Sequence, residues 1–182
     1  MFKELYKNYP NLLNDTTRIL SIGCGTGIDS MALNKINNNI CYYGVDRLDW
    51  NYKYLNDNTV YYIEDINNWL NNMTELNINV ICFPKSISEL EDDKIISAAR
   101  RISEINRDSD LYILVFLRAN DFTLSDDIDK SEKFIDELIN NGYNRSGGNV
   151  KDQYTTFVRK SEGIFKYNGF YEYPNDGVEL CC

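Results

Sequence analysis

The chain has 182 residues, 43% of them hydrophobic, and this predicts a single domain spanning residues 1–182 with a substantial core. It contains no histidine, the commonest general base and metal ligand, and we expect no metal site. A formal net charge of -9 argues against a surface that holds the phosphate backbone of a nucleic acid by itself. Residues 1–10 lack the apolar core of a signal peptide, and no apolar run is long enough to span a membrane, so we expect a cytoplasmic protein.

Short apolar runs of strand length follow one another along the chain, and most are nearly continuous rather than alternating. Such runs are typical of parallel strands that are covered on both faces. The five runs are residues 18–22, 40–45, 60–63, 78–83 and 111–117.

Helical patterns lie between and after these runs. Residues 88–105 and 131–139 repeat apolar side chains at helical spacing, and Asn141-Gly142 is a stop signal for the second helix. Strands alternating with helices predict a doubly wound α/β sheet. Residues 153–160 and 165–173 have no helix between them and predict a C-terminal antiparallel hairpin.

The stretch "RILSIGCGTGIDSMALNK", residues 18–35, places three glycines between the first strand and a helix. Glycines at such a turn let a ligand approach the backbone. A dinucleotide-binding loop needs G-x-G-x-x-G, but its third glycine position is Ile28 here, so that fingerprint fails.

Acidic residues follow the next two strands. Asp46 ends "YYGVD", where a carboxylate can accept hydrogen bonds from the two ribose hydroxyls of an adenosine. Glu64 and Asp65 follow residues 60–63, where a carboxylate can accept from an adenine amino group. A structural alternative stays open for both aspartates, because Asp46 could cap a helix near Leu48 and Asp65 one at Ile66.

Together these segments resemble the class I S-adenosylmethionine-dependent methyltransferases. "ILSIGCGTG", "YYGVD" and "YYIEDI" are similar to the family's first three motifs, and the resemblance covers about residues 16–118. It implies a Rossmann-like, mostly parallel sheet with helices on both faces and a reversed last strand. Within it we expect an N-terminal cap segment (1–16), a cofactor-binding core (17–118) and a C-terminal helix with antiparallel strands (119–182).

The resemblance also implies S-adenosylmethionine as cofactor and assigns residues to its site. The implied cofactor-binding residues are Gly23, Cys24, Gly25, Thr26, Gly27, Asp46, Arg47, Asp65, Ile66, Phe83 and Pro84. The family usually has an acid two residues before the first glycine, where this chain has Ser21. Asp29, in the first turn of the following helix, is a candidate to compensate, although a helix-start acid is the simpler account of it.

The methyl acceptor in this family meets the cofactor after the fourth strand, here in "INVICFPKSISEL", residues 78–90. Lys85, Ser86 and Glu89 are the candidate catalytic residues, with Tyr6 and Tyr9 as candidates to close the pocket. The competing interpretation is that Ser86 and Ser88 only cap a helix. Family members that methylate base amino groups often carry Asn or Asp, two prolines and an aromatic residue at this point. This chain has Phe83-Pro84-Lys85-Ser86 instead, so the resemblance does not extend to that subclass.

The sequence therefore predicts a methyltransferase that acts on a small molecule or a protein side chain. One alternative is an RNA methyltransferase whose partner subunit supplies the missing basic surface. Another is a non-catalytic domain that binds S-adenosylmethionine or S-adenosylhomocysteine.

Overall fold

The computed structural model describes residues 2, 6, 10–84, 86–106, 110–115, 124–145 and 155–159. In chain order its elements are β1 (Arg18–Ile22), α2 (Ile28–Asn34), β2 (Cys41–Asp46), β3 (Thr59–Ile63), α3 (Ile66–Asn71), β4 (Val80–Phe83), the short 3-10 helix η1 (Ile87–Glu89), α4 (Asp92–Ile105), β5 (Leu111–Val115), α5 (Leu124–Asn140), β6 (Asn144–Arg145) and β7 (Thr155–Arg159).

The strands form one sheet in the order β3-β2-β1-β4-β5-β7-β6. The first five are parallel, β7 is antiparallel to β5, and β6 is antiparallel to β7. The first three strands extend the sheet from β1 toward one edge, and β4 and β5 extend it toward the other edge. The order of the strands therefore reverses between β1 and β4, although both run in the same direction. Open α/β sheets bind ligands at the carboxyl ends of the strands beside such a switch.

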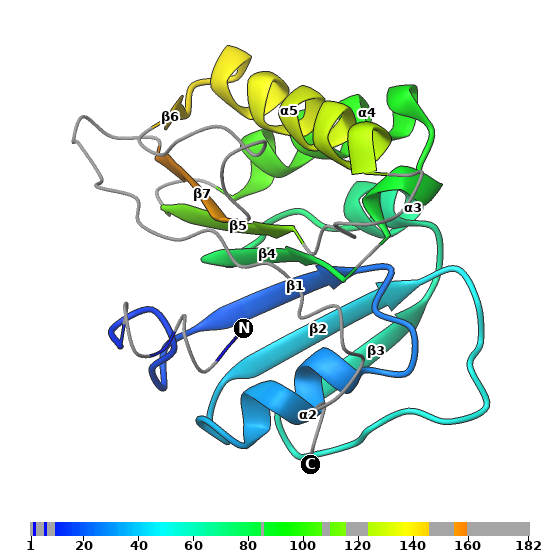
Figure 1. The fold of residues 1–182 in the computed structure, drawn as a ribbon, viewed down its shortest axis with the longest axis vertical. Helices are drawn as coiled ribbons and strands as arrows, with labels where there is room; N and C mark the ends of the chain where they lie inside the picture. The colour runs from blue at the N-terminus through cyan, green and yellow to red at the C-terminus, as the bar shows by residue number, and fades with distance from the viewer. Residues whose placement is uncertain are drawn as a thin grey trace.

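Helices cover both faces of the sheet, as Figure 1 shows: α2 lies on one face, and α3, α4 and α5 lie on the other. Neighbouring residues of β1 point to opposite faces, so Ile19 joins a cluster with Leu33 of α2, and Leu20 joins one with Ile102 of α4. Phe2, Leu12 and Leu13 pack in the α2-side cluster. The predicted doubly wound, mostly parallel α/β sheet is confirmed.

Within the described residues, the predicted strands agree with the structure to within about two residues, but two helices differ. The predicted helix 88–105 is interrupted, because Leu90 and Glu91 are extended and α4 begins only at Asp92. Lys130 of α5 holds the break, donating to the carbonyl oxygens of Ser88 and Leu90 at 2.7 Å each. Helix α5 starts at Leu124, seven residues before the predicted start, and ends at the predicted stop, where Gly142 has φ 103°.

Only the first strand of the predicted C-terminal hairpin lies within the described residues. Its first strand, predicted at 153–160, corresponds to β7, which pairs with β5 on one side and β6 on the other. The second predicted strand, 165–173, lies outside the described residues. Within the described part of the chain, no helix is both long and apolar enough to cross a membrane.

One buried side chain joins the end of α4 to the segment before β4. Asn106 is fully buried; its amide oxygen accepts from Ile78 N at 2.9 Å, and its amide nitrogen donates to Ile78 O at 3.1 Å. The Tyr143 hydroxyl donates to the Asn106 carbonyl oxygen at 2.8 Å. These bonds position the strand that leads to the predicted acceptor segment.

We expect Asn106→Ala to lower the free energy of unfolding by about 2–4 kcal/mol, because it leaves the buried amide and carbonyl of Ile78 without partners. Urea denaturation measures this loss. The control is Asn71→Ala on the exposed surface of α3, where a change within about 0.5 kcal/mol is expected. Equal losses in the two variants would contradict a structural role for the Asn106 amide.

Candidate functional site

The glycine loop joins β1 to α2 at the carboxyl end of the sheet, beside the switch between β1 and β4. Gly23, Gly25 and Gly27 have φ values of 70°, 56° and 75°, a left-handed backbone that side chains other than glycine rarely adopt. The three glycines differ in their surroundings.

The first and third glycines are in contact with the protein itself. A Cβ on Gly23 would lie 2.8 Å from Ser86 Oγ and closer still to Ser86 Cβ. A Cβ on Gly27 would lie 2.7 Å from Tyr61 Cζ and closer still to the hydroxyl oxygen. The loop is therefore held between β3 and the segment after β4, and both positions need glycine for packing.

Gly25 is the glycine with open space beside it. No atom of the described residues outside its immediate chain neighbours lies within 4 Å of a Cβ placed on it. Its N–H donates to Asp46 Oδ2 at 2.8 Å. The loop therefore leaves space for a ligand at its middle glycine, next to a carboxylate.

Asp46 connects the end of β2 to this loop. Oδ2 accepts from Gly25 N, and Oδ1 accepts from Leu48 N at 2.9 Å. Residues 47–58 contain no helix, so the helix-cap interpretation of Asp46 is wrong. A carboxylate has about four lone-pair sites, so two remain for a ligand.

Asp65, predicted from the same pattern, has a different environment. Its Oδ1 accepts from Asn67 N at 3.0 Å as the N-cap of α3, and its Oδ2 accepts from the Lys94 ammonium at 2.7 Å. Partial burial opposes ionisation, but these hydrogen bonds outweigh it and lower the pKa of Asp65. The helix-cap interpretation is confirmed here. Ile66 is 4% exposed and packs in the core.

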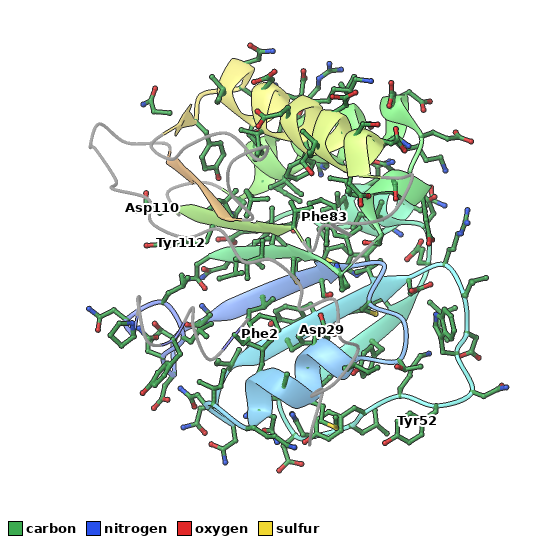
Figure 2. All side chains as sticks on the ribbon, in the orientation of Figure 1. Phe2, Asp29, Tyr52, Phe83, Asp110 and Tyr112 are labelled. Atoms are coloured by element: carbon green, nitrogen blue, oxygen red, sulfur yellow. The ribbon has the colours of Figure 1, made fainter. Side chains whose placement is uncertain are left out.

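The segment after β4 is packed against the glycine loop. The Ser86 hydroxyl donates to the Ile22 carbonyl oxygen, and the residue is buried. The Phe83 ring packs edge-on against Phe134 of α5, with ring centroids 5.1 Å apart, in the core on the α4 and α5 side of the sheet (Figure 2). These contacts give Ser86 and the Phe83 ring structural partners within the protein.

The other candidates belong to this segment or to the N-terminal residues. Glu89 is exposed in η1, and Pro84 is half-buried. Tyr6 is 44% exposed. Lys85 and Tyr9 lie outside the described residues.

The remaining loop candidates are placed as follows. Thr26 accepts from Tyr54 N at 3.0 Å through its carbonyl oxygen, and Arg47 is exposed. Cys24 is buried under the loop. Burial and the nearby carboxylates of Asp29 and Asp46 raise the pKa of its thiol to about 12, so no thiolate forms there at neutral pH. Among the described residues, no group of three or more His, Cys, Asp or Glu side chains could hold a metal ion.

A buried polar cluster lies beneath the loop. Asp29, 7% exposed in the first turn of α2, accepts from Ser21 Oγ at 2.6 Å and from the Tyr42 hydroxyl at 2.8 Å. Figure 2 shows Asp29 between α2 and the sheet. Ser21 and the carboxylate of Asp29 are therefore neighbours across the glycine loop.

Sequence analysis missed Tyr61, which packs against Gly27 and donates to the Tyr54 carbonyl oxygen at 2.7 Å. One signal was available. Gly44 interrupts the apolar run of β2, and a glycine inside a strand indicates a close approach by another group. A Cβ there would lie 2.7 Å from Tyr61 Cδ1 and 2.8 Å from Cys24 Sγ.

Solved structures with the same arrangement of strands and helices are methyltransferases. A methyltransferase from Aquifex aeolicus described as SAM dependent superposes with a TM-score of 0.57 over 86% of this chain and 86% of its own, at 16% identity. Human N-acetylserotonin methyltransferase, solved in complex with SAM, superposes with a TM-score of 0.56 over 88% of this chain, at 10% identity. This chain has the fold of the class I S-adenosylmethionine-dependent methyltransferases.

A third methyltransferase of this fold, described as SAM dependent and from Archaeoglobus fulgidus, has a TM-score of 0.51 and 16% identity over 79% of this chain and 68% of its own. The match to the human protein covers 54% of that longer chain. No protein-family model matches the sequence, and no curated protein matches it either. At these identities the comparisons establish the fold of the chain.

The packing of the loop predicts unequal costs for alanine at its glycines. We expect Gly25→Ala to cost about 1 kcal/mol of stability for its positive φ alone, and Gly23→Ala about 2 kcal/mol or more, because its Cβ also meets Ser86. Urea denaturation of both variants tests this order.

A double-mutant cycle isolates the contact. In a Ser86→Gly background, Gly23→Ala should cost about as little as Gly25→Ala does in the parent chain. If Gly23→Ala costs the same in both backgrounds, Ser86 is not the group that requires glycine at position 23.

Proposed function

We propose that the chain is an S-adenosylmethionine-dependent methyltransferase that acts on a small molecule or a protein side chain. The observation that carries the proposal is the open space beside Gly25, bounded by the Asp46 carboxylate at the carboxyl end of the sheet. The fold, shared with methyltransferases solved with or described as dependent on SAM, supports it.

The residues around that space fit the proposed cofactor. The two remaining lone-pair sites of Asp46 suit two adjacent ribose hydroxyls. The open side of Gly25 suits the close approach of a ligand to the backbone. Asp65 and Ile66 stay in the proposal as residues flanking the adenine, and Arg47 lies exposed directly after Asp46.

When bound, S-adenosylmethionine supplies an electrophilic methyl group, so the chain itself has little acid–base work to do. The segment after β4 is proposed to align the acceptor with that group. Several bonds support a fixed position for this segment: Ser86 binds Ile22, Lys130 binds the carbonyls of Ser88 and Leu90, and Asp127 accepts from Ser88 N at 3.2 Å.

The composition guides the choice of acceptor. With a net charge of -9, the chain is better suited to a small or proteinaceous acceptor than to a polyanion. An RNA acceptor would need a partner that supplies a basic surface. Exposed Glu89 is the carboxylate of this segment proposed to accept a proton from the acceptor where one must leave.

Asp46 provides the test of cofactor binding. We expect Asp46→Ala to weaken S-adenosylhomocysteine binding by about 2–4 kcal/mol, because charge-assisted hydrogen bonds to the ribose are lost. Titration calorimetry measures the affinity. The matched control is Asp57→Ala, an exposed aspartate before the opposite end of β3, which should bind as the parent does. If the parent chain binds neither S-adenosylmethionine nor S-adenosylhomocysteine, the proposed function fails.

The segment after β4 separates an enzyme from a binding module. We expect Lys85→Ala and Ser88→Ala to lower methyl transfer to an acceptor found by screening, with cofactor affinity nearly unchanged, because lost alignment affects the transition state. Ser86→Ala should also lower stability by about 1–3 kcal/mol, because the Ile22 carbonyl loses its partner. Parent-level transfer in all three variants would place the acceptor elsewhere.

A further inference from the structure

Asp29 is a buried carboxylate, and the described residues supply no buried cation to pair with it. Its hydrogen-bond partners are the hydroxyl groups of Ser21 and Tyr42, and within the described part of the chain it has no ion-pair partner. Burying an ionised carboxylate against neutral partners costs free energy. Such a costly buried carboxylate is expected where a bound ligand supplies the opposite charge.

Among the described residues, the titratable groups packed around Asp29 come from the loop and from β2, β3 and β4, and all of them are neutral at neutral pH. They are the thiols of Cys24 in the loop and Cys82 in β4, and the phenols of Tyr42 in β2 and Tyr61 in β3. Burial is the largest cause that raises the pKa of each group, and the negative charge of Asp29 raises it further. Lys53 also acts on Cys24, but its ammonium pairs with Asp49 at 2.9 Å.

Asp29 is close to the glycine loop both in the sequence and through its hydrogen bond. Asp29 follows Gly27 by two residues, and its carboxylate binds Ser21, two residues before Gly23. Cys24, inside the loop, is under the influence of both Asp29 and Asp46. Both carboxylates therefore act on Cys24 of the glycine loop and come from different elements, with Asp46 at the end of β2 and Asp29 at the start of α2.

We propose that Asp29, held in place by Ser21 and Tyr42, supplies the negative charge that binds the ammonium group of the methionine end of S-adenosylmethionine. This inference rests on the proposed function. It gives Asp46 and Asp29 separate tasks, with the ribose bound at Asp46 and the amino-acid end bound at Asp29. Ser21 and Tyr42 are positioning residues, because they fix the carboxylate by hydrogen bonds.

The pKa of Asp29 makes the binding depend on pH. Burial raises this pKa above its ordinary value of 3.8, with the hydrogen bonds of Ser21 and Tyr42 opposing the shift. An ammonium ion binds the ionised form, so affinity should rise as pH increases through the pKa of Asp29. In the ligand-free protein, the contribution of Asp29 to stability changes with pH in the opposite direction. The stability contributed by the raised pKa is full below 3.8 and is lost as pH rises through the folded-state pKa.

Truncated ligands distinguish this role from a structural one. S-adenosylhomocysteine keeps the ammonium group but has no sulfonium charge, and methylthioadenosine has neither charge. We expect Asp29→Asn to weaken binding of S-adenosylmethionine and S-adenosylhomocysteine by about tenfold or more, measured by titration calorimetry. Methylthioadenosine should bind the variant and the parent equally.

The pH profile is the second measurement. Parent affinity for S-adenosylhomocysteine should fall as pH is lowered toward the pKa of Asp29, and the Asp29→Asn variant should lack this fall. Tyr42→Phe and Ser21→Ala are the matched variants; each should weaken S-adenosylhomocysteine binding less than Asp29→Asn does and leave methylthioadenosine unaffected.

Three results overturn the assignment. Equal weakening of all three ligands by Asp29→Asn would show a structural role, and loss for S-adenosylmethionine alone would show a contact with the sulfonium. Unchanged binding of all three would remove Asp29 from the site. Failure of the parent chain to bind any of the three would instead reject the proposed function, so the two failures are distinguishable.

Discussion

The path of the loop between Gly23 and Gly27 is the constraint on which the rest of the site depends. At one end the backbone passes too close to Ser86 for any side chain at position 23, and at the other end too close to Tyr61 for one at position 27. Tyr61 can occupy its place because Gly44, in the strand between, has no side chain either. This packing ties the end of β1 to β3 and to the segment after β4, and the middle glycine is left facing open space.

The sequence predicts the sheet well because the information that defines it is local. Continuous runs such as 18–22 and 111–117 are apolar on both faces, which fits strands covered by helices on both sides. The break before α4 was not predictable in the same way. It is held by Lys130, about forty residues farther along the chain, and the apolar spacing across 88–105 continues through it. The early start of α5 was missed because its first turns are rich in serine and aspartate.

The site shows how far one sequence pattern can be trusted. Asp46 and Asp65 each follow an apolar run in the sequence, and the neighbouring residues do not indicate which of the two binds a ligand. The Asp46 carboxylate accepts a hydrogen bond from the glycine loop, whereas Lys94 of α4 and the start of α3 bind both oxygens of Asp65. The buried position of Phe83 was predictable from the alternation of side chains along its own strand. Alternation puts it on the same face as Ile81 and opposite Cys82, and thus in the core beneath α4 and α5.

The chemistry available to the chain also narrows its function. The chain has no histidine, and burial raises the pKa of the Cys24 and Cys82 thiols, so neither the usual general base nor a thiolate of these two residues is available beside the loop. Methyl transfer from a sulfonium needs neither, because the leaving group is a neutral thioether and alignment does most of the work. The bonds from α5 to the segment after β4 fix the position of that segment, which is consistent with its proposed role in aligning an acceptor.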